Sequence, residues 1–328
     1  MSLPDGVKAT TGGTFDRDAD PIYFLATSPG TMHGLTVASP EPRLAEHVLV
    51  AVNELESAST IEELGRTLDS GAKVLMDSGV FALSTGHAKV HGLTMDQALS
   101  LAPDEIDGFD RLYDRYCSLV ERFRDRLWGV IEIDQGGAVN KRLTRARLEA
   151  DLPGFVPMPV YHPLNDGWDY FDEVAGSYDR ICCGNVVQAN VALRTRLLAT
   201  FYERAAVYPY LWIHVLGYTP TGTTSSVPPQ GSCDSSSWLT STRWLAADKL
   251  RAMLHPWTRL RTDDRFTYER GLDPGEAGGQ PDAVRLNAYR AKMTEASWHA
   301  IRQERRDRGL LVQDLLPGLL AEHDMEVH

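Results

Sequence analysis

Three aspartates stand where short segments of the chain end in small or polar residues. Asp77 follows the apolar segment KVLM, Asp134 follows GVIEI, and Asp234 lies in the serine-rich segment CDSSSW. Carboxylates gathered in one pocket support two kinds of chemistry. One carboxylate can attack an anomeric carbon while another exchanges a proton with the leaving group, or the set can hold a divalent metal ion against a phosphate. For any single aspartate, a helix cap or a turn is the commoner role.

Other polar residues end further apolar segments. His162 follows PMPVY, and Gly184 and Asn185 follow RICC. His214 lies inside the apolar segment LWIHVLGY, and we interpret it as a core histidine rather than a ligand. These positions join the three aspartates as candidates for one shared pocket.

The chain repeats short apolar segments separated by amphipathic ones. The apolar segments have the length and composition of buried strands, and they occupy residues 22–28, 47–53, 73–79, 127–134, 155–162, 180–187 and 211–218. Stretches such as 105–126 and 191–206 predict helices between them. This alternation predicts a parallel α/β sheet and favours a (β/α)8 barrel of the TIM type over the alternative, an open doubly wound sheet. In such a barrel, catalytic residues lie at the carboxyl ends of the strands.

The composition along the chain divides it into parts. We expect a flexible lead over residues 1–20 and the catalytic barrel over 21–270. Residues 271–282 are rich in glycine and proline, which is typical of a linker, and 283–328 have a helical pattern that predicts a C-terminal extension. Residues 84–104 and 219–237 are interpreted as insertions or lids.

Charge and cysteine content limit the classes of function. Lys and Arg number 33 against 45 Asp and Glu in 328 residues, a net charge of −12, which argues against a uniformly basic nucleic-acid-binding surface. The four cysteines form no CxxC pair, so a cysteine-rich zinc site is not expected, and we interpret the adjacent Cys182 and Cys183 as buried packing. The chain shows neither a signal peptide nor an apolar run of about 20 residues, so we expect a cytoplasmic protein without membrane segments.

Two local groups of basic residues stand out against the acidic background. The groups are Lys141, Arg142, Arg145 and Arg147 just after Asp134, and Arg243, Lys249 and Arg251 just after Asp234. Each group can form a rim that attracts phosphates despite the negative net charge. The alternative interpretation is a solvated helix face.

Six segments, taken in order, resemble the tRNA-guanine transglycosylase superfamily. They are LMDSGVFAL (75–83), IEID (131–134), PMPVYHP (157–163), CCGNV (182–186), IHVLGYTP (213–220) and CDSSSW (233–238). The sequence departs from the family pattern at three of these motifs. Val80 stands at the second glycine of the DSGG-like motif, His162 at a glutamine, and Asn185 at the second glycine of a glycine pair. The cysteine-rich zinc site of the tRNA enzymes has no counterpart, which is more similar to the DpdA-type 7-deazaguanine DNA transglycosylases.

The resemblance implies a role for each matching residue. Asp234 would be the nucleophile at C1′ of the target nucleoside, and Asp77 the acid/base or base-positioning carboxylate. Asp134 would accept the N1–H and amino donors of a guanine-like base, a bidentate arrangement that suits a carboxylate. The remaining base-binding positions would be Ser78, Phe81, His162, Gly184 and Asn185, with Tyr161, Phe81 or Trp238 stacking on the base.

The function implied by the resemblance is base exchange. The enzyme would replace guanine in a polynucleotide, DNA rather than tRNA, with a 7-deazaguanine base such as 7-cyano-7-deazaguanine, through a covalent intermediate on Asp234. We expect no cofactor and no metal, with DNA and the free base as partners and a homodimer or a helper protein as a further possibility. Three alternatives remain open: exchange on tRNA or a nucleoside, a non-catalytic nucleic-acid-binding subunit, and an unrelated barrel hydrolase that uses two carboxylates.

Overall fold

The computed structural model describes most of the chain up to residue 236. The described residues are 3–15, 21–31, 46–218 and 231–236, together with Ala288, Glu295, His299, Gln303 and Asp307. The expected linker at 271–282, the basic residues Arg243, Lys249 and Arg251, and nearly all of the expected extension at 283–328 lie outside them.

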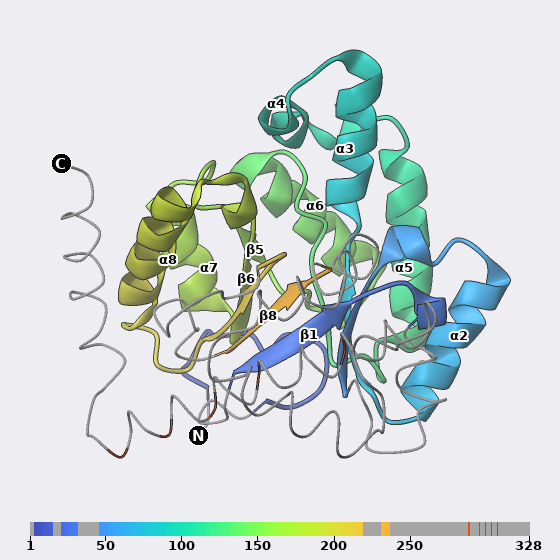
Figure 1. Ribbon diagram of the computed structural model, residues 1–328, viewed down its shortest axis with the longest axis horizontal. Coiled ribbons are helices and arrows are strands. Elements are labelled where there is room, and N and C mark those ends of the chain that lie inside the picture. Colours follow the sequence, from blue (N-terminus) through green and yellow to red (C-terminus); the bar gives the residue numbers. More distant parts are fainter. Residues whose placement is uncertain are drawn as a thin grey trace, which may run out of the picture.

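The centre of the described structure is one sheet of eight parallel strands that curls around on itself (Figure 1). The strands are β1 Ile22–Ala26, β2 His47–Ala51, β3 Lys73–Asp77, β4 Gly129–Val130, β5 Val160–Tyr161, β6 Arg180–Cys183, β7 Trp212–Val215 and β8 Gly231–Ser235. Their spatial order is β4-β3-β2-β1-β8-β7-β6-β5. The first and last strands therefore lie side by side in the middle of the sheet, which confirms the predicted parallel α/β architecture.

The ladder of a fully closed barrel is interrupted between β4 and β5. A single parallel bridge joins Ile131 to Met158 there, with a hydrogen bond of 3.0 Å from the Glu132 N–H to the Met158 carbonyl. Pro157 and Pro159 flank Met158, and proline has no N–H to donate to a ladder. The prediction of a complete barrel is corrected in this respect to a curled sheet with one weakly joined seam.

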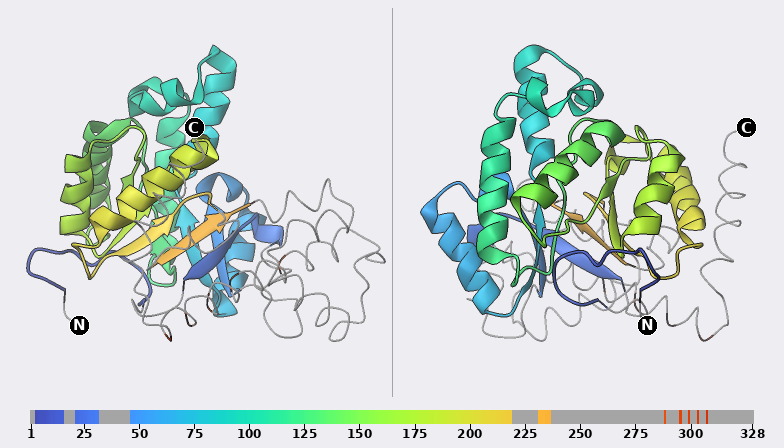
Figure 2. Two further views of the ribbon diagram at one scale, coloured as in Figure 1. Left: turned by 60° about the vertical axis from the view of Figure 1, so that its left-hand side comes forward. Right: turned by 180° about the vertical axis from the view of Figure 1, so that it is seen from behind.

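Helices cover the outer side of the curled sheet (Figure 2). They are α2 Ala58–Asp69, α3 Val80–His91, α4 Met95–Ser100, α5 Phe109–Phe123, α6 Gly137–Asp151, α7 Trp168–Ser177 and α8 Val191–Ala205, with short 3-10 turns η1 Val52–Glu54, η2 Pro103–Glu105 and η3 Val186–Gln188. The segment expected as an insertion at 84–104 consists of most of α3 and all of α4. These two helices stand above the sheet (Figures 1 and 2).

Alternation along the strands creates two apolar layers. Phe24 of β1 packs inside the curl with residues such as Trp128 and Trp212, whereas its neighbours Tyr23 and Leu25 pack between the sheet and the helices. Successive strand side chains point to opposite faces, so a strand buried on both sides is apolar at every position. Cys182 and Cys183 are both buried and unoxidised, as expected for packing residues. No helix of the described part of the chain is long and apolar enough to span a membrane.

The N-terminal lead is ordered where the structure describes it. The Lys8 N–H donates to the Ser177 carbonyl at 2.8 Å, and the Thr10 N–H donates to Asp179 Oδ1 at 2.8 Å. The buried guanidinium of Arg180 donates to the Thr10 carbonyl at 2.9 Å. Within the expected flexible lead, these hydrogen bonds hold Lys8 and Thr10 beside the start of β6.

Candidate active site

A cavity of about 490 Å³ opens at the carboxyl ends of the strands. The strand ends supply Ala26, Ala51, Asn53, Asp77, Asp134, His162, Gly184, Asn185, Gly217, Asp234 and Ser235 to its lining. All three sequence-predicted aspartates thus meet in one space, as parallel strands require of residues at their carboxyl ends.

Asp77 is the last residue of β3, and its pKa is raised above the ordinary value. The Gly79 N–H donates to its Oδ2 atom at 3.2 Å. Burial raises the pKa of Asp77, and the charges of Asp134 and Asp234 raise it further, from 3.8 to about 7. A carboxyl group in this range can donate and accept protons near neutral pH.

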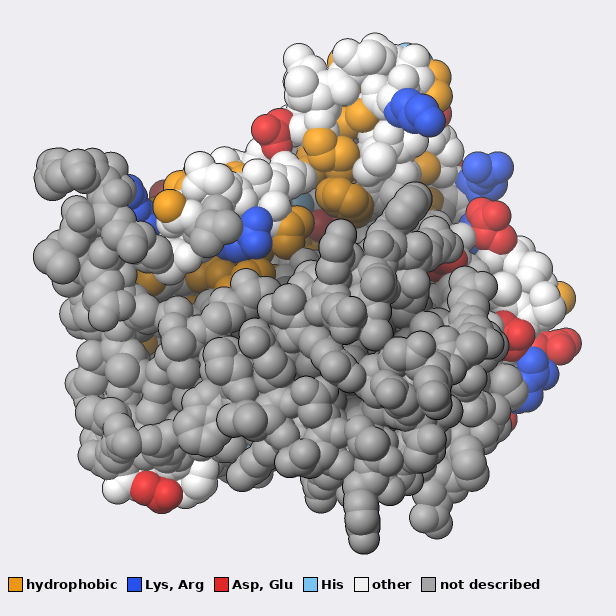
Figure 3. Space-filling model, in the orientation of Figure 1, with side chains coloured by type: hydrophobic (Ala, Val, Ile, Leu, Met, Phe, Trp, Pro, Cys, Tyr) orange, Lys and Arg blue, Asp and Glu red, His pale blue; other side chains and the backbone are white. Residues whose placement is uncertain are grey.

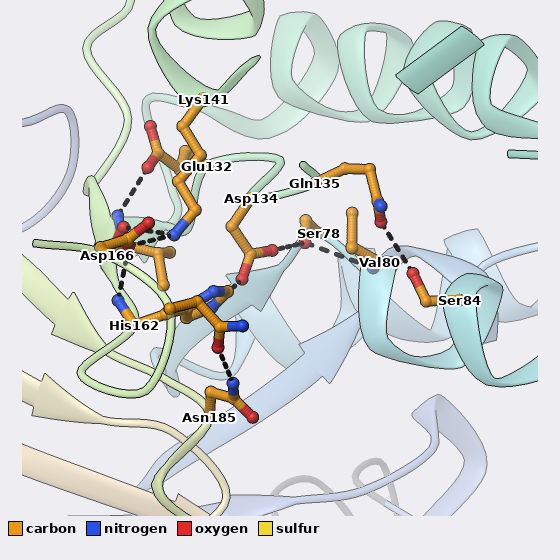
Figure 4. A network of polar contacts seen from close by, with 12 residues as sticks. Ser78, Val80, Ser84, Glu132, Asp134, Gln135, Lys141, His162, Asp166 and Asn185 are labelled. Carbon is orange, nitrogen blue, oxygen red and sulfur yellow. Dashed lines mark hydrogen bonds and ion pairs between the residues drawn. The ribbon is translucent and has the colours of Figure 1, made fainter. Parts of the chain in front are cut away.

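Asp134 lies beyond β4, and its pKa is shifted in the opposite direction to that of Asp77. The Nε2 atom of His162 lies 2.8 Å from its Oδ2 atom, and the Ser78 hydroxyl donates to Oδ1 at 3.4 Å (Figure 4). Burial works to raise the pKa of Asp134, but the His162 contact and the charge of Lys141 outweigh it and keep the pKa below its ordinary value. One cavity therefore holds an ionised carboxylate beside one that takes up a proton near neutrality.

Contacts fix both the backbone and the ring of His162. Its backbone N–H donates to Asp166 Oδ2 at 2.8 Å, and the same oxygen accepts from the Lys141 ammonium at 2.7 Å. A Cβ atom added to Gly184 would lie 2.8 Å from the Cδ2 atom of His162. Glycine at 184 therefore leaves room for the imidazole to reach Asp134.

Asp234 lies in β8, and both contacts that orient its carboxylate are made to the same oxygen. Its Oδ1 atom accepts the Gly217 N–H at 2.8 Å and lies 3.2 Å from the Nε2 atom of His214. The other ring nitrogen of His214 lies 2.8 Å from the Ser232 hydroxyl. Within the described residues, these are the hydrogen bonds of the Asp234 carboxylate.

Sequence reasoning missed the role of His214 beside Asp234. The interpretation as a core histidine is confirmed, because the side chain is fully buried. However, His214 pairs in register with Ser232, two residues before Asp234 on the same face of β8. The signal in the sequence was a polar residue in an otherwise apolar strand next to the strand that carries the aspartate.

Ser78, Phe81 and Asn185 lie around the same cavity, whereas Tyr161, expected to stack on the base, is buried outside the lining, and Trp238 lies outside the described residues. Ser78 is buried, whereas Phe81 at the start of α3 is 56% exposed on the rim. Asn185 adopts the left-handed region at φ 62° and donates to Asn165 Oδ1. Its own Oδ1 atom is buried and has no hydrogen-bond partner in the described structure, and the same is true of Asn53, a lining residue that sequence reasoning missed.

The first basic group does not form a phosphate-binding rim. Lys141 is fully buried in its ion pair with Asp166. Arg145 is buried as well and donates to both carboxylate oxygens of Glu132, at 2.7 and 3.1 Å. The prediction of nucleic-acid binding by Lys141 and Arg145 is wrong, because residues four apart on α6 share the face that packs on the sheet.

The other two members of that group are exposed but already paired. Arg142 donates to both oxygens of Glu173, in each case through Nε at 3.0 Å. Arg147 lies 3.6 Å from Asp110 and 3.8 Å from Asp151. A phosphate at Arg142 would compete with Glu173 for the same guanidinium.

The surface around the cavity is mixed in character. Hydrophobic side chains and a few Lys and Arg side chains appear together on the described part of the upper face (Figure 3). Val187, 38% exposed, lines the cavity together with Phe81. Among the described residues, the cavity aspartates are too far apart to form a group of three metal ligands.

Fold and site together define an α/β protein with a carboxylate-lined pocket at the carboxyl edge of a curled parallel sheet. No family model and no curated protein matches this chain.

Proposed function

We propose that this protein is a base-exchanging transglycosylase that replaces guanine in a polynucleotide, DNA rather than tRNA, with a 7-deazaguanine base. The observation that carries the proposal is the meeting of Asp77, Asp134 and Asp234 in one cavity, where the pKa of Asp77 is raised and that of Asp134 is lowered. A glycosidic exchange needs a nucleophile, a proton donor and an acceptor that recognises the base. The three carboxylates of the cavity supply one group for each of these functions.

Asp234 is the nucleophile in this proposal. One of its carboxylate oxygens bonds to C1′ of the target nucleotide, and the bond between C1′ and the purine breaks with its electron pair leaving on the base. Asp77, protonated near neutral pH, gives a proton to the departing base. The incoming base then returns a proton to Asp77, bonds to C1′ and releases the Asp234 carboxylate.

Asp134 recognises the base before and after the exchange. An ionised carboxylate accepts two hydrogen bonds at once, which matches the N1–H and amino group of guanine. The contact with His162 keeps Asp134 ionised and directs one of its oxygens. The volume of the cavity, about 490 Å³, lies within the range of small-molecule sites.

The target nucleotide has to leave its base stack to reach the cavity. Such flipping costs about a few kcal/mol in a duplex. Exposed Phe81 on the cavity rim is placed to stack on the flipped base. In this function the curled sheet corresponds to a TIM-type barrel whose seam is the Ile131–Met158 bridge. The exchange would take place in the cytoplasm.

The test is exchange of labelled guanine, measured on DNA and on tRNA in parallel, with and without an unlabelled 7-deazaguanine base. Label that enters DNA, and is excluded by the competitor, supports the proposal. Label that enters tRNA only corrects the polynucleotide and keeps the mechanism. No label in either polynucleotide contradicts an independent exchange enzyme and favours a binding subunit.

Two variants separate catalysis from binding. Asp234→Asn should abolish exchange and leave binding of the polynucleotide unchanged, because the amide has nearly the shape of the acid. Asp125→Asn, at an exposed position between α5 and the amino end of β4 and outside the cavity lining, is the matched control and should retain exchange. Equal exchange by both variants would remove Asp234 from the mechanism.

A further inference from the structure

Two histidines and one aspartate form a cluster outside the cavity. His87 and His91 are one turn apart on α3, so their rings share one face of the helix, with centroids 4.1 Å apart. Asp107, between η2 and α5, brings its Oδ2 atom to 2.8 Å from His91 Nε2 and 3.4 Å from His87 Nδ1. Within the described residues, this is the one group of three side chains placed to share a metal ion.

We propose that His87, His91 and Asp107 bind one divalent transition-metal ion of the zinc class. Two imidazole nitrogens and a carboxylate oxygen are a donor set that such ions prefer. Ligands about 2.1 Å from a tetrahedral ion lie about 3.4 Å from one another. The Asp107 oxygen lies 2.8 and 3.4 Å from the two ring nitrogens, and all three ligand atoms lie within 4.8 Å of one another, so the side chains have to shift to meet that geometry.

Ring nitrogens of both histidines face Asp107. The Asp107 N–H approaches the Nδ1 atom of His87 at 3.3 Å, a long hydrogen bond in which this nitrogen is the acceptor. The Asp107 carboxylate oxygen lies 3.4 Å from the same nitrogen. A metal ion bound to Nδ1 would take the place of this hydrogen bond and would be shared by the nitrogen and the carboxylate oxygen.

The position of the cluster indicates what the ion would do. Binding would join the C-terminal part of α3 to Asp107, two residues before α5, and would close the segment 92–106 into a loop. That segment contains α4, and its Leu99 lines the cavity together with Phe81 from the first turn of α3. The ion would therefore hold the far end of a helix pair whose near end forms a wall of the cavity.

A hydrogen-bond chain already fixes the near end of the same helix pair. The Gln135 side chain donates to the carbonyls of Ala98 and Leu101 at 2.8 and 2.9 Å, and it accepts from the Ser84 hydroxyl at 2.7 Å (Figure 4). Gln135 directly follows Asp134. A metal ion at His87, His91 and Asp107 would add the second anchor of this wall, a structural role that stands independently of base exchange.

The test is titration of the full, tag-free chain with Zn²⁺ by calorimetry, and with Co²⁺ by visible absorption, after treatment with a chelator. We expect one ion per chain and the absorption of a tetrahedral Co²⁺ site. His91→Gln and Asp107→Asn should each weaken binding about 100-fold or more, because amides are poor zinc ligands. Both positions are exposed, so these variants do not disturb the core as a change at buried His87 would.

Two further measurements decide where the ion binds and what it does. Asp134→Asn should keep the full affinity, because it alters the cavity and leaves the cluster intact. Zn²⁺ should slow amide hydrogen exchange in residues 92–106 of the unaltered protein and not in Asp107→Asn. Absence of one-to-one binding, or binding that is insensitive to the changes at His91 and Asp107, would overturn the proposal.

Discussion

The imidazole of His162 lies with Nε2 2.8 Å from Oδ2 of Asp134, and Gly184 packs against the edge of the same ring. Asp134 follows β4, and His162 follows β5. These are the two strands between which the sheet has only a single bridge. The contact between the two side chains therefore spans the seam at the point where the cavity opens.

Removing the imidazole should raise the pKa of Asp134. His162 is the main group that keeps this pKa below its ordinary value, and burial acts in the opposite direction. In His162→Ala, the acid limit of base exchange should move to higher pH, because Asp134 must be ionised to accept the donors of guanine. A pH–rate profile of kcat/KM for the variant and the unaltered protein measures the shift. Identical acid limits would show that His162 does not control Asp134.

Base exchange should decrease as the pH rises through about 7. Asp77 has a pKa of about 7, raised by burial and by the other two aspartates, and the proposed mechanism uses its protonated form. In Asp77→Asn this alkaline limit should disappear together with the activity. The measurement is the pH–rate profile of single-turnover exchange. An alkaline limit that stays near pH 7 in a residually active Asp77→Asn variant would assign it to another group.

The same group makes a stability prediction with a definite sign. The folded protein binds the Asp77 proton more tightly than the unfolded chain, whose ordinary pKa is 3.8. This contribution to stability is therefore complete below pH 3.8 and is lost as the pH rises towards 7. A shift of about three pKa units corresponds to about 4 kcal/mol, and contact with solvent in the cavity reduces this to about 1–2 kcal/mol. Asp77→Asn should thus unfold at a higher temperature than the unaltered protein at pH 8, as calorimetry would show.

A methyl group at residue 184 should displace His162. The added Cβ would lie 2.8 Å from the ring, which costs about 1–3 kcal/mol as the side chain moves. Gly184→Ala should reduce both stability in urea and base exchange. Gly65→Ala in α2 is the matched control, because the added Cβ would point into open space, and it should stabilise the protein by less than about 1 kcal/mol. Normal exchange by Gly184→Ala would show that the glycine has no part in placing His162.

Arg145 should act on stability rather than on nucleic-acid binding. Its guanidinium is buried and donates to Glu132 and to the Tyr170 hydroxyl, the latter at 2.7 Å. Arg145→Ala leaves Glu132 charged and without its partner, which should cost about 3–5 kcal/mol. Urea unfolding measures this loss. The salt dependence of DNA binding, measured at a temperature where the variant is folded, should be the same as in the unaltered protein.

His214 should affect the rate of the chemical step more than the binding of substrate. It lies 3.2 Å from Asp234 Oδ1 and does not line the cavity. Loss of this contact allows the nucleophile to turn, and a misplacement of about 1 Å can cost about 10²-fold in rate. We expect His214→Ala to lower kcat with little change in KM, and His214→Gln to restore part of the rate. A change confined to KM would contradict a positioning role.

The sequence by itself determined the strand order along the chain and the approximate position of the pocket. Apolar segments at regular intervals, each followed by a polar residue, predict parallel strands whose carboxyl ends carry Asp77 and Asp134, whereas Asp234 was expected in an insertion or lid and lies in β8. This works because a strand buried on both faces has to be apolar throughout. A polar residue is therefore conspicuous where such a strand ends. The short segment around Asp234 was found from its motif rather than from apolar content.

Only the tertiary structure decided which charges pair and which side chains face inward. In the sequence, Lys141 and Arg145 are typical of a solvated basic surface. Both side chains are nevertheless buried, because each forms an ion pair, Lys141 with Asp166 and Arg145 with Glu132. The different proton affinities of Asp77 and Asp134 likewise depend on burial and on His162, 28 residues away from Asp134. Electrostatic energies depend on distance and on exposure to solvent, and neither quantity is contained in the order of residues alone.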